Sequence, residues 1–350
     1  MGELVSIIVP TYNRAYCIQR TIDSVRAQSH VNWELIVVDD GSSDDTAELI
    51  RSNIAEDSRI RYVYQDNTGV SAARNTGIRA ATGDLVAFLD SDDVWKSWKL
   101  NLQVQCFRAF PEIGMVWTDF ASVDRLGAIV NQRHLRTMYH AYRFFPTPES
   151  LFPEGHELSC IGMTGLEGGM KPRVYIGNIY SAMLRGNLVH TSTVMVSRDR
   201  LNCVKGFDEA LLLSGEDYDF HFRTCKWGKV CFVDVPSTMY QVDSSDRLSH
   251  YRAQVAMNFA KTVEAAIARE KGSGSFSASA INEVLAEAHG WAAEELFKTK
   301  DRSRAGAHAF RSLRHNPRQP RLALLLGLAI VPVQVSEALV RTYRYLKHAV

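Results

Sequence analysis

Residues 83–93 read GDLVAFLDSDD, a short apolar run that ends in a cluster of carboxylates. Two earlier stretches also join a short apolar run to a polar turn, because 5–14 reads VSIIVPTYNR and 33–42 reads WELIVVDDGS. A short apolar run bounded by turn residues is typical of a strand that is buried on both faces. We therefore expect these stretches to be strands of one buried sheet, each followed by a polar turn.

Segments with helical spacing separate these runs. Ile18, Ile22 and Val25 follow the first run at intervals that place them on one side of a helix, and a further apolar run lies at 60–64. Strands that alternate with helices predict βαβ units and an α/β fold with a mainly parallel sheet. Ligands bind at the carboxyl ends of the strands in such sheets, so the polar turns are the expected site.

The chain is less regular after the first 120 residues. Residues 120–190 are rich in Gly, Pro, Arg and aromatic residues and show weak periodicity, which predicts loops and short elements attached to the sheet. Strands are expected at 191–196, 230–235 and 238–242. The remainder has a helical pattern throughout, broken by a flexible connector at 271–275.

The overall charge hides an uneven distribution. The chain has 350 residues, 46% of them hydrophobic, which suits a sizeable core and about two domains, and its formal net charge is +1. Residues 302–350 carry nine basic side chains and one acidic side chain, a net charge of +8, so the first 301 residues carry −7. No recognised nucleic-acid-binding motif accompanies this basic tail, and we expect no nucleic-acid partner.

The basic tail also contains an apolar stretch at 322–333 with basic residues on both sides. Twelve residues are fewer than the ~20 needed to span a bilayer as a helix, and Pro332 would bend the helix. We expect 302–350 to make peripheral contact with an anionic membrane. A buried hairpin or a contact that forms a homo-oligomer, and a true membrane span, are the alternatives.

The cysteines and the start of the chain indicate the compartment. Six cysteines lie without the spacing of a disulfide framework or a metal site. No signal peptide is recognised, so free thiols in a reducing compartment are expected. The predicted location is the cytoplasm, at the inner face of the cell membrane.

Two pairs of acids follow predicted strands. Asp90 and Asp92 lie one residue apart, where they can hold a hard divalent cation that keeps open positions for substrate phosphates. Asp39 and Asp40 can accept hydrogen bonds from a base or a ribose. Both pairs also suit an ordinary turn or helix cap, because Asp is favoured in each.

A third acidic cluster, Glu216, Asp217 and Asp219, begins a predicted helix. Acids at a helix N-terminus are favoured by the helix dipole, but a carboxylate there can also take a proton from an attacking hydroxyl. The first strand is followed by PTYNR and not by G-x-G-x-x-G, which argues against a dinucleotide-dependent oxidoreductase.

Taken together, these motifs resemble the family-2 glycosyltransferases with the GT-A fold. The resemblance covers about residues 4–249 and rests on four stretches in the family's order: VSIIVPTYNR, WELIVVDDGSSDDT, GVSAARNTGIRAATGDLVAFLDSDD and STVMVSRDRLNCVKGFDEALLLSGEDYDFHFRTCKWG. It implies a Rossmann-like, mainly parallel sheet flanked by helices, a nucleotide-sugar bound over the sheet edge, Mn²⁺ or Mg²⁺ on a D-x-D motif, and inversion of the anomeric carbon. Residues 1–250 would form this domain, with the donor half at about 1–120 and the acceptor half at about 121–250, and 251–350 an all-helical extension.

Position by position, the resemblance implies three groups of site residues. The nucleotide-sugar contacts are Pro10, Tyr12, Arg14, Asp40, Arg74, Asn75, Asp90 and Ser91. The metal ligands are Asp92 and Asp90, and the general base is Asp217 with Glu216 beside it. Gln241 departs from the family's pattern, because it stands where an Arg is common, and this leaves a third ligand such as His250 undecided. His190 is expected to be a structural histidine, with a place in the acceptor pocket as the alternative.

We therefore expect a metal-dependent, inverting glycosyltransferase that uses a UDP-sugar. The acceptor would be a hydroxyl of a glycan or of a lipid-linked molecule in polysaccharide or glycoconjugate synthesis. One alternative is a nucleotidyltransferase on a similar sheet, which the lack of a glycine-rich loop after the first strand opposes. The other is a non-catalytic subunit that binds nucleotide-sugars or glycans.

Overall fold

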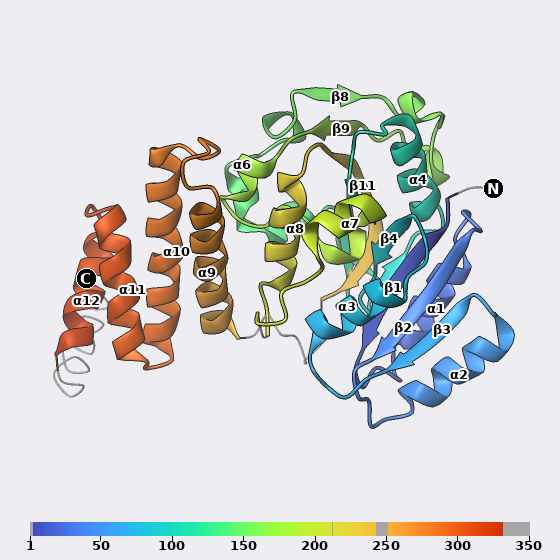
Figure 1. Ribbon diagram of the computed structural model, residues 1–350, viewed down its shortest axis with the longest axis horizontal. Helices are drawn as coiled ribbons and strands as arrows, with labels where there is room; N and C mark the ends of the chain where they lie inside the picture. Colours follow the sequence, from blue (N-terminus) through green and yellow to red (C-terminus); the bar gives the residue numbers. More distant parts are fainter. Residues whose placement is uncertain (1–2, 212, 243–250, 332–350) are drawn as a thin grey trace. The chain divides into compact units, whose positions relative to one another are not determined.

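Four of the predicted apolar runs form parallel strands at one side of a single sheet (Figure 1). β1 (Val5–Thr11) lies between β2 (Trp33–Asp39) and β4 (Leu85–Phe88), and β3 (Ile60–Tyr64) pairs with β2. The computed structural model describes residues 3–211, 213–242 and 251–331. The prediction of a parallel βαβ arrangement is confirmed for this half of the sheet.

The other half of the sheet is mixed. The strand order is β3-β2-β1-β4-β10-β6-β11-β9-β8. β10 (Met195–Ser197) runs antiparallel to both neighbours, whereas β6 (Met115–Val123) and β11 (Val230–Gln241) are parallel to each other. The remaining strands pair antiparallel and are β5 (Val94–Trp95), β7 (Ile129–Asn131), β8 (Glu154–His156) and β9 (Val174–Gly177).

The strand predicted at 191–196 begins later than expected. Thr191–Thr193 form a 3₁₀ turn, and β10 starts only at Met195. The backbone N–H of Thr193 donates to the His190 carbonyl at 2.9 Å, and the Thr193 hydroxyl donates to the same carbonyl at 2.6 Å. These local bonds replace strand pairing at the start of the segment.

The two strands predicted at 230–235 and 238–242 are one strand, β11. Its register against β6 shifts on both sides of Pro236. Proline has no N–H to contribute to strand pairing, so the pairing is interrupted there although the backbone stays extended.

Alternate side chains of the parallel strands face two different helical layers. Val5, Ile7 and Val9 of β1 share one core with α1 (Ile18–Arg26), α2 (Thr46–Glu56) and α4 (Lys99–Ala109). On the other face, Ile8 lies against α3 (Val70–Ala80), and Phe88 packs edge-to-face with Phe220 of α8 (Glu216–Lys226) at 5.5 Å between ring centroids. Burial on both faces explains why these strands read as continuous apolar runs.

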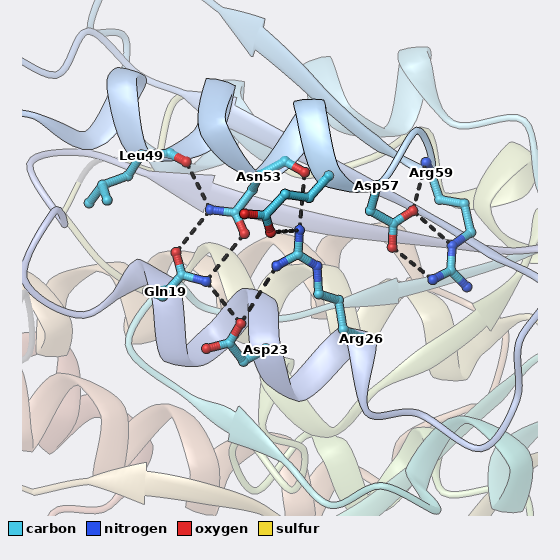
Figure 2. A network of polar contacts seen from close by, with 8 residues as sticks. Gln19, Asp23, Arg26, Leu49, Asn53, Asp57 and Arg59 are labelled. Atoms are coloured by element: carbon cyan, nitrogen blue, oxygen red, sulfur yellow. Dashed lines mark hydrogen bonds and ion pairs between the residues drawn. The ribbon is translucent and has the colours of Figure 1, made fainter.

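A polar network joins α1 to α2 (Figure 2). The side-chain amides of Gln19 and Asn53 bond to each other in both directions, at 3.2 and 2.9 Å. Arg26 donates to the Asn53 carbonyl at 3.1 Å and lies 3.1 Å from Glu56. The network fixes α1 against α2. α1 also carries Thr21, whose hydroxyl lies 2.9 Å from the carbonyl oxygens of Ser91 and Asp93 in the turn after β4.

The segment between β6 and α8 consists of short elements, as predicted for its part within residues 120–190. The helices are α5 (Leu135–Met138), α6 (Tyr180–Met183) and α7 (Arg198–Val204). Further 3₁₀ turns lie at His140–Arg143, Pro148–Ser150, Leu158–Ile161 and Glu167–Gly169.

The chain divides into two compact units, residues 1–212 with 216–247 and residues 213–215 with 248–350. The second unit contains α9 (Arg252–Arg269), α10 (Ala278–Lys298), α11 (Arg302–His315) and α12 (Pro320–Ile330). The Ser277 hydroxyl and the Asp301 carboxylate cap the starts of α10 and α11, each accepting a backbone N–H at 3.1 Å. The predicted all-helical C-terminal region is confirmed for residues 251–331.

α12 covers most of the predicted apolar stretch. Leu322 and Leu325 pack into the core of the helical unit, whereas Leu324 is 59% and Ile330 is 77% exposed. Among the residues that the structure describes, no helix has the length and hydrophobicity to cross a membrane. Pro332 and the basic residues that follow it lie outside the described residues.

Gly77 of α3 has no room for a side chain, because a Cβ there would lie 2.4 Å from Cγ2 of Ile8. Gly77→Ala should therefore displace α3 from the sheet and lower the free energy of unfolding by about 1–3 kcal/mol, measured by chemical denaturation. Gly327→Ala is the matched control, since Gly327 is also helical and a Cβ there meets nothing within 4 Å. The control should be neutral or slightly stabilising, and equal losses in both variants would contradict this packing.

Candidate functional site

The turns after β1 and β2 are bound to each other at the carboxyl edge of the sheet. The backbone N–H of Asn13 donates to the Ser42 hydroxyl at 2.9 Å, and the Ser43 N–H donates to Oδ1 of Asn13 at 2.8 Å. Asn13 has a φ of 52°, in the left-handed region that asparagine adopts more readily than most residues. The Arg14 N–H donates to the hydroxyl of Thr46 at 2.9 Å.

The residues predicted to form the nucleoside pocket lie around this pair of turns. Pro10 is buried in β1, Tyr12 is 46% exposed just beyond the strand, and Arg14 is half-buried. Asp40 is buried in the turn after β2. The structure therefore brings all four to one edge of the sheet, and their contact with a nucleoside stays a prediction.

Asp40 organises the segment that leads into α3. Its Oδ1 accepts the Thr68 N–H at 2.9 Å and the Gln65 side-chain amide at 2.8 Å, and its Oδ2 accepts the Gly69 N–H at 2.8 Å. α3 begins directly after Gly69, and negative charge is favoured at a helix N-terminus. The Asp40 carboxylate thus joins the end of β2 to the start of α3.

The D-x-D segment is a tight turn after β4. The Asp93 N–H donates to the Asp90 carbonyl at 3.0 Å, and the Asp90 N–H donates to the Ser192 hydroxyl at 3.1 Å. The Thr21 hydroxyl lies 2.9 Å from the carbonyl oxygens of both Ser91 and Asp93. α1 and the segment before β10 therefore fix this turn from two sides.

Arg74, buried in α3, joins the D-x-D turn to the acidic start of α8. Its Nη2 donates to Oδ1 of Asp90 at 2.8 Å, and its Nη1 donates to Oε1 of Glu216 at 2.9 Å. The guanidinium also lies over the Phe207 ring, 5.1 Å from its centroid. Desolvation raises the pKa of the Asp90 carboxyl, but the positive charge of Arg74 outweighs it and holds that pKa below its usual value.

Asp217 lies beside Glu216 at the start of α8 and is half-buried. Its Oδ2 accepts the side-chain amide of Asn187 at 3.1 Å. Desolvation, followed by the negative charge of Glu216, raises the pKa of Asp217 to about 6. A carboxylate with a pKa near neutrality is suited to accept a proton during a reaction.

Asp92 is the half-buried carboxylate of the D-x-D turn. Desolvation, followed by repulsion from Asp93 and Asp90, raises the pKa of Asp92 to about 7. A bound cation relieves such repulsion, and carboxylate oxygens suit Mg²⁺ and Mn²⁺. No group of three or more potential ligand side chains is found within residues 3–211, 213–242 and 251–331. The residues fit an ion held by one or two carboxylates, with its other positions open to further oxygen ligands.

Asn75 and Ser91 are the two remaining residues predicted to contact the nucleotide-sugar donor. The side-chain amide of Asn75 donates to the Phe207 carbonyl at 2.9 Å and to Glu209 at 2.8 Å, and its oxygen accepts the Phe207 N–H at 2.8 Å. Ser91 is buried in the D-x-D turn. Asn75 therefore fastens the 207–209 segment to α3, and direct donor contact by Asn75 or Ser91 stays a prediction.

Gln241, at the end of β11, accepts a hydrogen bond from Arg20 at 2.8 Å. His250, named as a further ligand candidate, lies outside the described residues. His190 is buried near the D-x-D turn, with Nε2 3.5 Å from Oδ2 of Asp93 and Nδ1 3.1 Å from the Tyr139 hydroxyl.

The structure adds three residues that the sequence did not single out. Ser192 supports the D-x-D turn, Asn187 bonds to Asp217, and Tyr139 bonds to His190. Asn187 and Tyr139 come from the weakly periodic segment 120–190, where no motif marks them. Ser192 is the first residue of the STVMV stretch, but a lone serine before a strand carries no functional signal.

Residues 6–159 match the family profile described as Glycosyl transferase family 2. The chain is 47% identical over 129 residues to the putative teichuronic acid biosynthesis glycosyltransferase TuaG of Bacillus subtilis, covering 35% of this chain and 51% of that protein. It is 46% identical over 104 residues to the UDP-Glc:alpha-D-GlcNAc-diphosphoundecaprenol beta-1,3-glucosyltransferase WfgD of Escherichia coli, covering 29% of this chain and 40% of that protein. The chain spans about half or less of the length of the curated relatives it matches.

Solved structures share the fold over most of the chain. S. aureus TarS 1–349 in complex with UDP-GlcNAc aligns with a TM-score of 0.55 at 16% identity, covering 93% of this chain and 84% of that one. The mannosyltransferase PcManGT from Pyrobaculum calidifontis, in complex with GDP-Man and Mn²⁺, aligns with a TM-score of 0.51 at 19% identity, covering 99% and 83%. At these identities the likeness shows the fold.

Arg74→Met removes the charge between two carboxylates and should lower the free energy of unfolding by about 3 kcal/mol at pH 7. Because Arg74 lowers the pKa of Asp90, this stabilisation is present at neutral pH and is lost as the pH falls below about 4. The free energies of unfolding of Arg74→Met and of the unchanged protein should therefore become equal in acid. Denaturation at several pH values measures this difference. Arg79→Met, an exposed position of the same helix, is the control, and a similar loss there would show that the bridge is not the cause.

Proposed function

Residues 6–159 form a glycosyl transferase family 2 domain on a GT-A fold, and we therefore propose that this chain is a metal-dependent, inverting glycosyltransferase. The family and the fold expected from the sequence are confirmed. The proposed reaction moves a sugar from a nucleotide-sugar to a hydroxyl of a glycan or a lipid-linked acceptor. The Arg74 bridge carries this proposal, because it holds the D-x-D turn and the acids of α8 in one site.

The donor is proposed to be a UDP-sugar bound over the carboxyl edge of the sheet. Two similarities support UDP: TarS carries UDP-GlcNAc in its complex, and WfgD is named for UDP-Glc. We assign the nucleoside to the pair of joined turns, with Tyr12 and Arg14 on one side and Asp40 on the other. Because Asp40 holds the start of α3, it also shapes the wall of this pocket.

Asp92 is proposed to hold Mn²⁺ or Mg²⁺, with Asp90 beside it. The negative charge of Asp90 is paired with Arg74, whereas the Asp92 carboxylate is repelled by the charges of Asp93 and Asp90. A bound cation would therefore stabilise the Asp92 carboxylate more than that of Asp90. When bound, such an ion supplies positive charge that stabilises the diphosphate as it leaves. The complex of PcManGT with GDP-Man and Mn²⁺ supports this assignment.

Asp217 is proposed as the general base. An oxygen of the acceptor hydroxyl forms a bond to the anomeric carbon while the bond from that carbon to the diphosphate oxygen breaks, and the electron pair leaves with the diphosphate. The hydroxyl proton moves to the Asp217 carboxylate, which Asn187 orients. Attack opposite the leaving group inverts the anomeric carbon. Glu216 does not share this role, because it is bonded to Arg74.

Peripheral contact of residues 302–350 with an anionic membrane, and hence a place at the cytoplasmic face, remains part of the proposal. The exposed Leu324 and Ile330 of α12 support it, as does the exposed side chain of Arg321. WfgD is named for a diphosphoundecaprenol-linked acceptor, which supports a lipid-linked acceptor here. A homo-oligomer stays a prediction.

Asp217→Asn should abolish transfer while leaving the Kd for UDP unchanged, since only the proton acceptor is lost. In the unchanged protein at saturating Mn²⁺, turnover should rise with pH as Asp217 loses its proton and reach a plateau above the Asp217 pKa of about 6. One pH unit below that pKa, turnover should be about a tenth of the plateau. Initial rates from pH 4.5 to 8 measure this. Asp208→Asn, an exposed acid nearby, should keep the same profile, and normal turnover by Asp217→Asn would remove Asp217 as the base.

Asp92→Asn should weaken Mn²⁺-dependent UDP binding by more than about tenfold, because a carboxylate ligand is replaced by a neutral amide. Calorimetry with UDP in the presence of Mn²⁺, and again with EDTA, measures the metal-dependent part. Asp84→Asn is the matched control, at the opposite end of the same strand region and exposed. Equal UDP affinities for Asp92→Asn and the control would contradict the metal assignment.

A further inference from the structure

His190 lies between the D-x-D turn and the segment that contains Tyr139. It is 7% exposed, and its ring stacks on Phe120 with 4.3 Å between centroids and an interplanar angle of 30°. Its Nε2 lies 3.5 Å from Oδ2 of Asp93, and its Nδ1 lies 3.1 Å from the Tyr139 hydroxyl. Stacking fixes the plane of the ring, so both ring nitrogens are held toward a polar partner.

The Asp93 end of this chain of contacts belongs to the candidate metal turn. Asp93 is 1% exposed, and its carboxylate faces His190 and Ser192. Among the described residues, neither oxygen of the Asp93 carboxylate has a hydrogen-bond partner, so the ion-pair contact with His190 at 3.5 Å offsets part of the cost of burying this carboxylate. The same turn carries Asp92, which points to solvent more than Asp93 does.

The Tyr139 end lies among the groups assigned to the reaction. Burial raises the pKa of Tyr139, and the negative charges of Asp217 and Asp90 raise it further, so the phenol is close enough to both carboxylates to feel them. Its segment is held in place, because the Tyr142 hydroxyl donates to the Leu188 carbonyl at 2.7 Å. Tyr139 itself is half-buried, which leaves part of its side chain accessible to a ligand.

We propose that the Tyr139 hydroxyl binds the sugar unit being transferred. His190, which lies between this hydroxyl and the Asp93 carboxylate, is a positioning residue that orients the hydroxyl. The inference rests on the transfer reaction proposed above. In that reaction the sugar must lie between the diphosphate at the D-x-D turn and the acceptor at Asp217. Tyr139 is close enough to Asp90 of this turn and to Asp217 for both negative charges to act on its phenol. The Tyr139–His190 pair then aligns the sugar with its leaving group, the kind of alignment that lowers a reaction barrier.

Two single variants and their double variant test this inference. The donors are UDP-glucose, UDP-GlcNAc and GDP-mannose with Mn²⁺, and the one that the unchanged protein turns over is used further. Tyr139→Phe should lower kcat/KM for that donor about tenfold, the effect of losing one hydrogen bond, while the Kd for UDP stays unchanged because UDP lacks the sugar unit that is transferred. His190→Gln keeps an amide near Asp93 but cannot reach Tyr139, and should show a similar loss.

The double variant separates action through Tyr139 from independent effects. If His190 acts through Tyr139, Tyr139→Phe/His190→Gln should be no slower than Tyr139→Phe alone. Tyr175→Phe, which removes the hydrogen bond from the phenol to Glu149 at 2.6 Å, is the structural control, expected to lower the melting temperature and to leave kcat/KM for the donor unchanged. Unchanged kcat/KM in Tyr139→Phe, or losses that multiply in the double variant, would overturn the inference alone. Failure of the unchanged protein to turn over any of the three donors would instead overturn the transfer reaction.

Discussion

The candidate site depends on one buried guanidinium. Arg74 lies between Asp90 of the D-x-D turn and Glu216 of α8, and without it two carboxylates would face each other in a poorly solvated space. Burying a charge is tolerated only when it is paired and hydrogen-bonded, so the bridge obliges α3, the turn after β4 and the start of α8 to come together. The close packing of Gly77 on Ile8 holds the same helix against the sheet.

Arg74 neutralises only part of the negative charge of the site. Asp92 and Asp217 retain raised pKa values, each by desolvation first and by neighbouring carboxylates second. The two acids nevertheless suit different tasks, because Asp92 is surrounded by the acids of its own turn and Asp217 is held by the neutral amide of Asn187. Environment and not residue type separates a metal ligand from a base in such a site.

The sequence predicts the parts of this protein that repeat a simple pattern. Apolar runs followed by polar turns located β1, β2 and β4, and the helical spacing located the C-terminal helices. The partners of the key side chains could not be found this way, because Arg74 reaches Glu216 only through the folded chain, and Tyr139 and Asn187 lie in a segment without periodicity. The error at β11 has a similar origin, since Pro236 is a strand breaker by propensity and is tolerated here by a shift in register.

The central claim is that the bridged acids serve sugar transfer from a nucleotide-sugar with the help of a divalent ion. Its most direct test is the nucleotide product formed from a UDP-sugar in the presence of Mn²⁺ and an acceptor, resolved by phosphorus NMR. The account predicts UDP in equal amount to the sugar transferred, and no product when EDTA replaces Mn²⁺. Release of pyrophosphate, or equal amounts of UDP with and without the metal, would contradict it.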